Sequence, residues 1–352
     1  MEMLSNFSLI LGFDLWHTII GWFGSWIPNY GWAIIVFTIA LKLLMSPLDI
    51  YQRISTKKQQ KFQTAMQPEL QAIQAKYANN KEKLNQETAK IYKKYNFNVG
   101  GMCLSMLLTM GLSMVVFFTL FSSLRSYGTQ KLYSTYSELD KAYIDTIAKI
   151  DNKKLEDLTD LEKTTLTIAI QQEYKQVSKQ NSWLWVKNVW KKDTTESQFV
   201  DFNSYADYIG LNGTERDEAK VRYDYIVTTI DGEKTQPNGY FVLLILAVVI
   251  SFLTQWLTTK MTMPKGQKLN TMNKVMMALI PLTMVILASS SNVVFTLYVI
   301  VNSVMSAIIS AILACTMKPK TDQSGDIILP KKNVEVVEYS RNHANFRNKG
   351  EK

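Results

Sequence analysis

The 352-residue sequence contains few of the residues on which metal and nucleophile chemistry depends. It has two cysteines, Cys103 and Cys315, and two histidines, His17 and His343, that lie far apart in the chain. The patterns HExxH, CxxC and GxSxG are missing, as is a phosphate-binding P-loop, so no metal site, nucleophile or cofactor is expected. Both cysteines fall in apolar stretches, which argues against a disulfide framework. These absences favour a protein that is not an enzyme.

Charged residues make up 20% of the sequence, but several long apolar runs contain almost none of them. A run of about 20 apolar residues is long enough to cross a bilayer as a helix. We therefore expect an all-α, multi-pass membrane protein with a core of five transmembrane helices. The segments predicted to cross the membrane are residues 29–50, 99–125, 240–259, 275–290 and 291–316.

Residues 1–28 differ from these runs because they mix aromatic and polar side chains. Asp14 and His17 fall in the middle of the segment, which also contains three tryptophans and three phenylalanines. That mixture fits a helix lying in the plane of the membrane interface better than a helix that spans it. We expect an N-terminal interfacial helix.

The connecting segments predict the orientation through their lysines and arginines. Residues 51–98 carry ten basic and three acidic residues, the loop 260–274 carries four basic residues and no acid, and the tail 317–352 carries eight basic and five acidic residues. Residues 126–239 carry 15 basic and 19 acidic residues. Five spans place the three basic segments on one side, which should be the cytoplasm. The N-terminus and residues 126–239 should then lie on the outside of the cell (plasma) membrane.

Two of these segments are long enough to have structure of their own. Apolar residues at helical spacing predict a helical hairpin over residues 51–98, with its turn at Asn79-Asn80. Residues 126–239 are expected to form a mostly helical external insertion, with one short strand at 225–230. Within it, SWLWVKNVW (182–190) has three tryptophans, which suit a membrane interface.

Lys42 is the charge that the first apolar run retains. A charged side chain at the centre of a bilayer costs roughly 2.5–3.5 kcal/mol on insertion scales, so such residues usually face a water-filled cavity or a partner. The alternative is that Lys42, six residues before Leu48, snorkels to the headgroups. We take the first interpretation, in which Lys42 is the charge of a groove.

Four predicted spans carry small polar residues at a spacing of four, which places them on one face of a helix. Each stripe alone is typical of helix–helix packing in membranes. Four stripes and a charge together favour a shared hydrated groove that opens sideways to lipid. The predicted polar lining is Thr38, Ser105, Thr109, Ser113, Gln255, Asn302, Ser303 and Ser306, with Ser251 and Ser310 on the same stripes.

Several motifs resemble the YidC-type membrane protein insertases, the superfamily that includes the mitochondrial and chloroplast insertases. NYGWAIIVFTIALKLLMSPL (29–48) is similar to the family's first span, and QPELQAIQAKYANNKEKLNQETAKIYKKYNFNVGGMC (67–103) to its cytoplasmic hairpin. SWLWVKN (182–188), Pro281 and LYVIVNS (297–303) are weaker matches. The resemblance covers residues 14–125 and 240–316, and its hairpin motif is the most specific part.

The resemblance implies a five-helix core with a hydrophilic groove that is open to cytoplasm and lipid and holds a basic residue, at the position of Lys42. It further implies an insertase and chaperone for membrane proteins that needs no nucleotide or metal. The implied partners are nascent membrane proteins and membrane lipid, together with the ribosome, the signal recognition particle pathway and the Sec translocon. Direct DNA binding is not implied.

The sequence departs from the family pattern at several positions. Lys42 replaces the usual arginine, Thr109 stands where the family often has glutamine, and residues 99, 105 and 111 replace prolines. The external insertion is also longer than in most single-membrane bacterial members. These departures allow a specialised paralogue with a different range of clients.

Two other functions compete with insertion. A small transporter or channel could use Lys42 as an anion site, but such proteins often contain inverted repeats, and the sequence has none that we detect. A scaffold could act through residues 126–239, in which case Lys42 would be dispensable.

Overall fold

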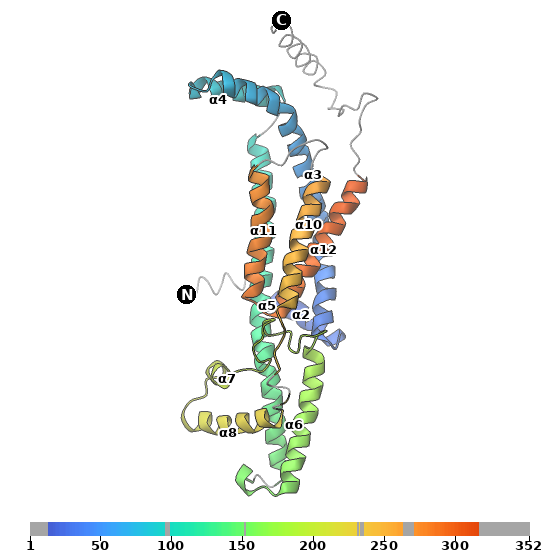
Figure 1. Ribbon diagram of the computed structural model, residues 1–352, viewed down its shortest axis with the longest axis vertical. Coiled ribbons are helices and arrows are strands. Elements are labelled where there is room, and N and C mark those ends of the chain that lie inside the picture. The colour runs from blue at the N-terminus through green and yellow to red at the C-terminus, as the bar shows by residue number, and fades with distance from the viewer. Residues whose placement is uncertain are drawn as a thin grey trace. The chain divides into compact units, whose positions relative to one another are not determined.

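The computed structural model describes residues 13–95, 99–150, 153–230, 232, 236–262 and 271–316. These residues form α-helices joined by turns and loops, and their β-structure is limited to two isolated bridges (Figure 1). The chain divides into two compact units. The larger unit comprises Met1–Pro47, Gly111–Thr259 and Lys268–Ile308, and the smaller unit comprises Leu48–Met110, Lys260–Gln267 and Ile309–Lys352.

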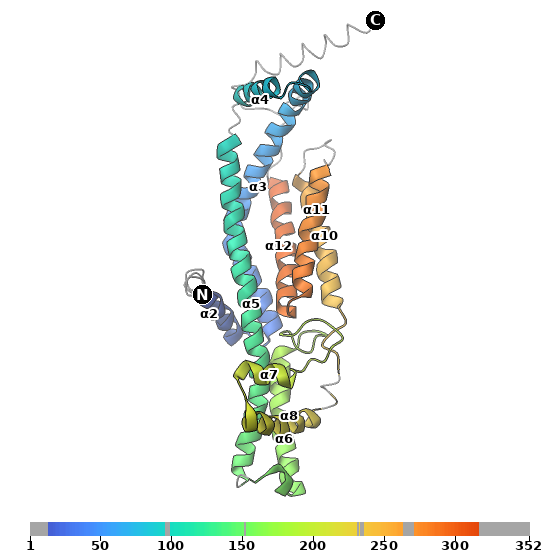
Figure 2. The ribbon, with the colours of Figure 1, turned by 90° about the vertical axis from the view of Figure 1, so that its left-hand side faces the viewer.

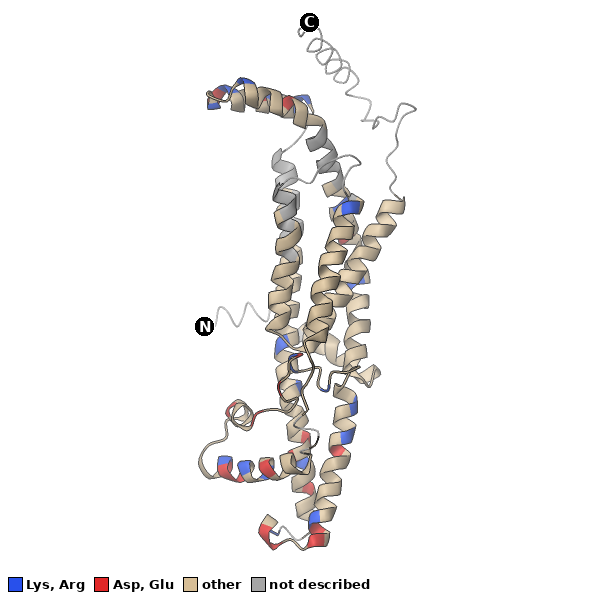
Figure 3. Ribbon diagram, in the orientation of Figure 1, with Lys and Arg blue, Asp and Glu red and all other residues tan. Residues whose placement is uncertain are grey.

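Three of the described helices are long and apolar enough to cross a membrane. They are Tyr30–Thr56, the first part of helix α3 (Tyr30–Lys76); Val242–Met261, nearly all of α10 (Val242–Thr262); and α12 (Val293–Thr316). Charged residues are sparse on these helices (Figure 3). The chain is therefore a membrane protein with several apolar helices, as the sequence predicted. The other two predicted spans fall on helices α5 (Val99–Lys149) and α11 (Thr271–Ser289), so the five-span core stays a prediction.

Helices α3 and α5 run well beyond the segments predicted to span the membrane. α3 continues through Pro47 and Pro68, where the chain is rich in glutamine, lysine and alanine, all good helix formers. α5 continues through Gly128, where a Cβ atom would collide with the side chain of Asn292. The side-chain amide of Asn292 donates to the Leu124 carbonyl at 3.3 Å, which links the residue before α12 to the middle of α5.

In the smaller unit, the end of α3 and helix α4 (Lys81–Lys94) form the predicted hairpin, and the turn at Asn79-Asn80 is confirmed. The side chain of Asn80 caps α4 by accepting from the Lys83 amide at 3.0 Å. Burial and a hydrogen bond to Glu69, 3.0 Å away, raise the pKa of Tyr95 to about 12, so this phenol stays a neutral donor. The hairpin core is small and consists of Met66, Ile91 and Tyr95.

The predicted external insertion has a hydrophobic core of its own within the larger unit. It is formed by the second half of α5 and by helices α6 (Asp160–Asn181), α7 (Phe202–Ile209) and α8 (Gly213–Thr229), and is rich in tyrosine. α6 lies alongside α5, and α8 lies across them (Figure 2). Arg222 of α8 and Asp140 of α5 add a partly buried ion pair of 2.8 Å. The prediction of a mostly helical region is confirmed.

The short strand predicted at 225–230 is wrong, because α8 extends to Thr229. The buried residues Tyr223, Ile226, Val227 and Ile230 recur at intervals of three and four, which is the period of a helix. Packing against α5 and α6 therefore outweighs the β-propensity of this run.

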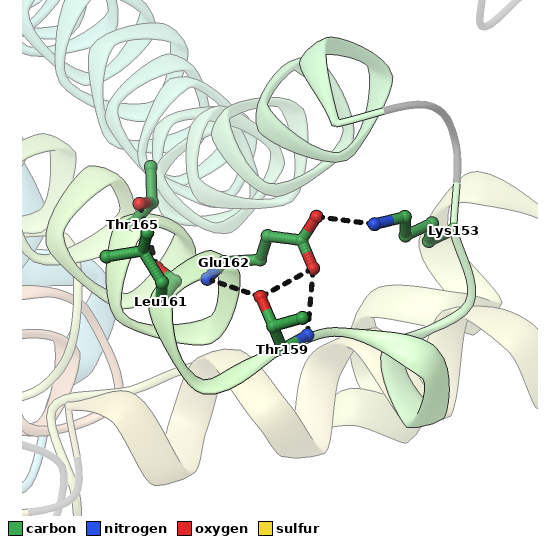
Figure 4. Close-up of polar contacts among 5 residues, drawn as sticks. All are labelled: Lys153, Thr159, Leu161, Glu162 and Thr165. Carbon is green, nitrogen blue, oxygen red and sulfur yellow. Dashed lines mark hydrogen bonds and ion pairs between the residues drawn. The ribbon is translucent and has the colours of Figure 1, made fainter.

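Helix α6 begins with a capping box (Figure 4). Thr159 accepts from the Glu162 amide at 3.4 Å, and its own amide donates to Glu162 Oε2 at 2.8 Å. Lys153 Nζ lies 2.6 Å from Oε1 of the same carboxylate. The hydrogen bond from Lys153, followed by those from Thr159, lowers the pKa of Glu162 to about 2.

We expect this carboxylate to make the start of α6 sensitive to acid. Because the pKa of Glu162 falls from 4.5 to about 2 on folding, its stabilisation is complete above pH 4.5 and disappears as the pH falls toward 2. Hydrogen exchange, corrected for intrinsic rates, should show weaker protection of the first turn of α6 in Glu162→Gln at neutral pH. The protection of this turn should become equal in the parent and in Glu162→Gln as the pH approaches 2. A difference in protection that persists there would contradict this assignment.

Candidate functional site

Lys42 lies on a face of α3 that is otherwise turned inward. Ile34 and Thr38, two turns and one turn earlier, are buried, and the Thr38 hydroxyl donates to the Ile34 carbonyl at 2.7 Å. Lys42 itself is half-buried, whereas its neighbours Leu43 and Leu44 are exposed, Leu44 by 76%. The ammonium group is therefore carried on the protein-facing side of an apolar helix, with the exposed leucines on its other side.

The predicted stripes of α10 and α12 meet at one point. Ser251 is buried, and its Oγ lies 3.4 Å from Oγ of Ser303. Asn302 and Ser306 flank Ser303 on α12 and are half-buried, as is Gln255 one turn after Ser251. This contact is the usual packing of small polar residues between membrane helices, and it also places hydroxyl and amide groups on adjoining turns.

The remaining predicted lining residues lie on α5. Ser113 is half-buried. The backbone of Ser105 and Thr109 is part of helix α5, but the structure does not describe their side chains. A groove lined by all eight residues thus stays a prediction.

Arg53 has a setting that its sequence neighbours did not reveal. By sequence, Arg53 is one of the basic residues of the predicted hairpin, residues 51–98. In the structure, the apolar helix Tyr30–Thr56 includes Arg53. Its guanidinium is half-buried and donates to the hydroxyl of Ser310, a buried residue of α12, within the smaller unit. The one sequence feature that pointed to this contact was the polar stripe of α12, which ends at Ser310.

The tryptophan-rich stretch of the insertion packs onto the first turns of the apolar helices. We call residues 182–193 the tryptophan segment. The ring of Trp190 lies 4.9 Å from that of Tyr30 at the start of α3 and 5.6 Å from that of Tyr127 on α5. Its Nε1 donates to Asn181 Oδ1 at 2.8 Å. Trp190 is buried, so this one side chain joins α3, α5 and α6.

The same segment satisfies the first amides of α12. The carbonyls of Val189 and Lys191 accept from the amides of Val294 and Val293, at 3.1 and 2.8 Å. Backbone amides at a helix start have no partner within the helix, and leaving them unpaired in an apolar setting is costly. The tryptophan segment thus provides the acceptors that α12 needs where it begins.

The side chain of Asp193 provides hydrogen-bond acceptors for the backbone amides where α10 begins. Its buried carboxylate accepts from the amides of Phe241, Leu243 and Leu244, at 3.2, 2.7 and 3.4 Å. A negative charge at the first turn of a helix is also favoured by the helix dipole. Gly239 lets the carboxylate approach, since a Cβ atom there would collide with Asp193 Oδ1.

We expect Asp193→Ala to destabilise the detergent-solubilised protein by about 1–2 kcal/mol, the usual loss for a helix cap. Asp193→Asn keeps one oxygen acceptor and should lose less. Gly239→Ala should resemble Asp193→Ala, because the new methyl group displaces the carboxylate. Denaturant unfolding of the three variants checks this. Equal stability of Asp193→Ala and the parent would show that the carboxylate does not cap α10.

Comparison with known proteins gives a match over most of the chain. The profile of the 60Kd inner membrane protein family matches residues 22–320. The chain is also similar to proteins named membrane protein insertase YidC, among them the three that follow. The one from Leptospira interrogans is 41% identical over 96 residues, 27% of this chain and 14% of the relative. The one from Caldanaerobacter subterraneus is 37% identical over 102 residues, which are 29% of this chain and 46% of the relative. The one from Clostridium tetani is 46% identical over 83 residues, which are 23% of this chain and 36% of the relative. The matched part spans less than half the length of each relative.

Proposed function

Because the chain belongs to the 60Kd inner membrane protein family, the family of the YidC insertases, we propose that it inserts membrane proteins into the bilayer and helps them fold. The family match over residues 22–320 carries the proposal. The half-buried Lys42 within an apolar helix supports it, because an insertase needs a polar place inside the membrane. The activity makes and breaks no covalent bond.

The proposed core has five spans: the apolar parts of α3, α5, α10, α11 and α12. Basic residues then put the hairpin, the loop 260–274 and the tail in the bacterial cytoplasm, and residues 126–239 outside. Helix α2 (Phe13–Trp26) lies in the interface. It exposes Trp22 and Trp26 while Ile20 joins the core, which is the amphipathic pattern of an interfacial helix.

In the proposed mechanism, the polar part of a client enters a hydrated groove while its apolar part slides into lipid. Moving a polar segment through hydrocarbon is costly because its backbone and charges lose water. A groove that reaches partway across shortens the dry path. Lys42 attracts acidic residues of the client, and the hydroxyl and amide groups of the lining residues replace some of the lost water.

The proposed clients are nascent membrane proteins. The described part of the hairpin exposes six lysines on one small element, so it is suited to polyanionic or acidic partners such as a translating ribosome or components of the signal recognition particle pathway. The exposed lysines are Lys76, Lys81, Lys83, Lys90, Lys93 and Lys94. The Sec translocon is a further proposed partner, on the strength of the family resemblance alone.

Depletion and rescue tests the proposed function. A bacterial host is depleted of its own insertase, and the chain is expressed while protease protection of a small single-span client is followed. Restored insertion is the expected result. A well-folded, membrane-located chain that leaves the client uninserted would contradict general insertase activity.

A further inference from the structure

The tryptophan segment begins with a tight turn whose two central residues are both large and apolar. Trp183 and Val186 exchange two backbone hydrogen bonds of 2.9 Å, which closes a two-residue turn. Leu184 and Trp185 form its tip, and both are exposed, by 66% and 37%. A tip of this kind in water would be occupied by small or polar residues.

Leu184 also has a backbone conformation that does not suit leucine. Its φ is +51°, in the left-handed region where glycine and asparagine are favoured. The chain therefore retains leucine at a position where both the backbone and an aqueous setting would favour another residue. Contact of the side chain with an apolar environment explains this choice.

The turn is fixed beside the start of an apolar span. The ring of Trp183 packs so closely on Gly31 that a Cβ atom there would collide with it, and it lies 5.8 Å from the ring of Trp32. Asn29 Nδ2 donates to the Ser182 carbonyl at 2.6 Å. Since the apolar part of α3 begins at Tyr30, the turn lies next to the start of a helix that is long and apolar enough to cross a membrane.

A second residue repeats the pattern independently. Phe241 has a φ of +60°, is exposed, and immediately precedes the apolar helix Val242–Met261. Among the described residues other than glycine, Leu184 and Phe241 are the two with positive φ. Each is a large apolar residue next to the start of a span.

We propose that the tip of this turn, Leu184 and Trp185, inserts into the lipid headgroup and acyl boundary on the side of the membrane where residues 126–239 lie. Tryptophan is enriched at this depth because its ring is apolar and its N–H is polar. The exposed Trp32 ring beside the turn continues the same apolar surface onto α3. The turn anchors the tryptophan segment, and through it the first turns of α10 and α12, at a fixed depth.

A nitroxide-quenching experiment on the full chain tests this proposal. Cys103→Ser and Cys315→Ser provide a background without thiols. An environment-sensitive dye is then attached at Leu184→Cys in liposomes of phosphatidylglycerol and phosphatidylethanolamine that contain a lipid with a nitroxide near its headgroup. The control is Leu161→Cys, since Leu161 is 77% exposed but lies at the other end of α6, about 30 Å away at 1.5 Å per residue.

The dye at position 184 should be quenched and blue-shifted, and the dye at 161 should not. In addition, Leu184→Asn suits the positive φ but removes the apolar tip, so a dye at Trp185→Cys should lose its quenching in that variant while the protein stays folded. Equal, weak quenching at 184 and 161 would overturn the proposal. Protection of position 184 in native membranes but not in pure liposomes would also overturn it, and would indicate a protein partner instead.

Discussion

Trp190→Ala should destabilise the protein by about 3–5 kcal/mol, the usual range for removing a buried tryptophan. The ring is buried between Tyr30 and Tyr127 and also packs within the core that includes the start of α12. Its loss leaves a cavity where three helices meet and leaves Asn181 without its indole donor. Unfolding of the solubilised protein in denaturant measures the effect.

Trp190→Phe is the matched control. It keeps most of the ring but removes the hydrogen bond to Asn181, so the expected loss is about 1–3 kcal/mol. If Trp190→Ala and Trp190→Phe were equally stable, the packing of Trp190 against the first turns of the helices would not matter to the fold.

Lys42→Ala should impair the insertion of clients with acidic segments while leaving the fold largely intact. A unit charge about 8 Å from a client carboxylate, at an effective dielectric constant of about 20, contributes about 2 kcal/mol, which corresponds to a roughly 30-fold change in rate. Lys42→Arg should keep the activity, because arginine holds its charge even in a dry site. Protease protection of an acidic client in depleted cells measures all three proteins.

Two controls separate the charge from the helix that carries it. Leu44→Ala alters an exposed side chain two residues away and should leave insertion unchanged. A client whose acidic residues are replaced by asparagine and glutamine should depend less on Lys42. Equal insertion by the parent and by Lys42→Ala for the acidic client would support the alternative in which Lys42 snorkels to the headgroups.

The sequence was sufficient for the features that depend on local pattern. Apolar runs predicted the three helices long enough to cross a membrane, and the Asn79-Asn80 pair predicted the turn of the hairpin. The family was predicted from the motif at 67–103, and the match over residues 22–320 confirms it. Each of these signals is contained in one contiguous stretch.

Features that depend on contacts between distant segments could not be predicted in the same way. Isoleucine, valine and threonine in 225–230 favour a strand locally, and burial against α5 and α6 makes the run helical instead. Asp193 is one of 19 acidic residues in the insertion, and its sequence neighbours do not indicate that it caps α10, 48 residues later. Arg53 likewise depends on Ser310, 257 residues away.

The polar lining of the groove lies between these two cases. The spacing of Thr38 and Lys42 puts them on one face of the helix α3, and Ser251 of α10 lies 3.4 Å from Ser303 of α12. Spacing fixes the face of a helix, but it does not say whether the hydroxyls face water or each other. The shared groove therefore remains a proposal that needs a direct test of its contents.

Photo-crosslinking from position 42 is the most direct test that a client passes beside Lys42. A photoreactive amino acid is placed at Lys42 or, as the control, at the exposed Leu44, and ribosomes are stalled while they synthesise a single-span client. We predict that position 42 crosslinks to the polar flank of the client, and position 44 to lipid or to the client's apolar segment. Crosslinks from position 42 to lipid alone would contradict the proposed groove.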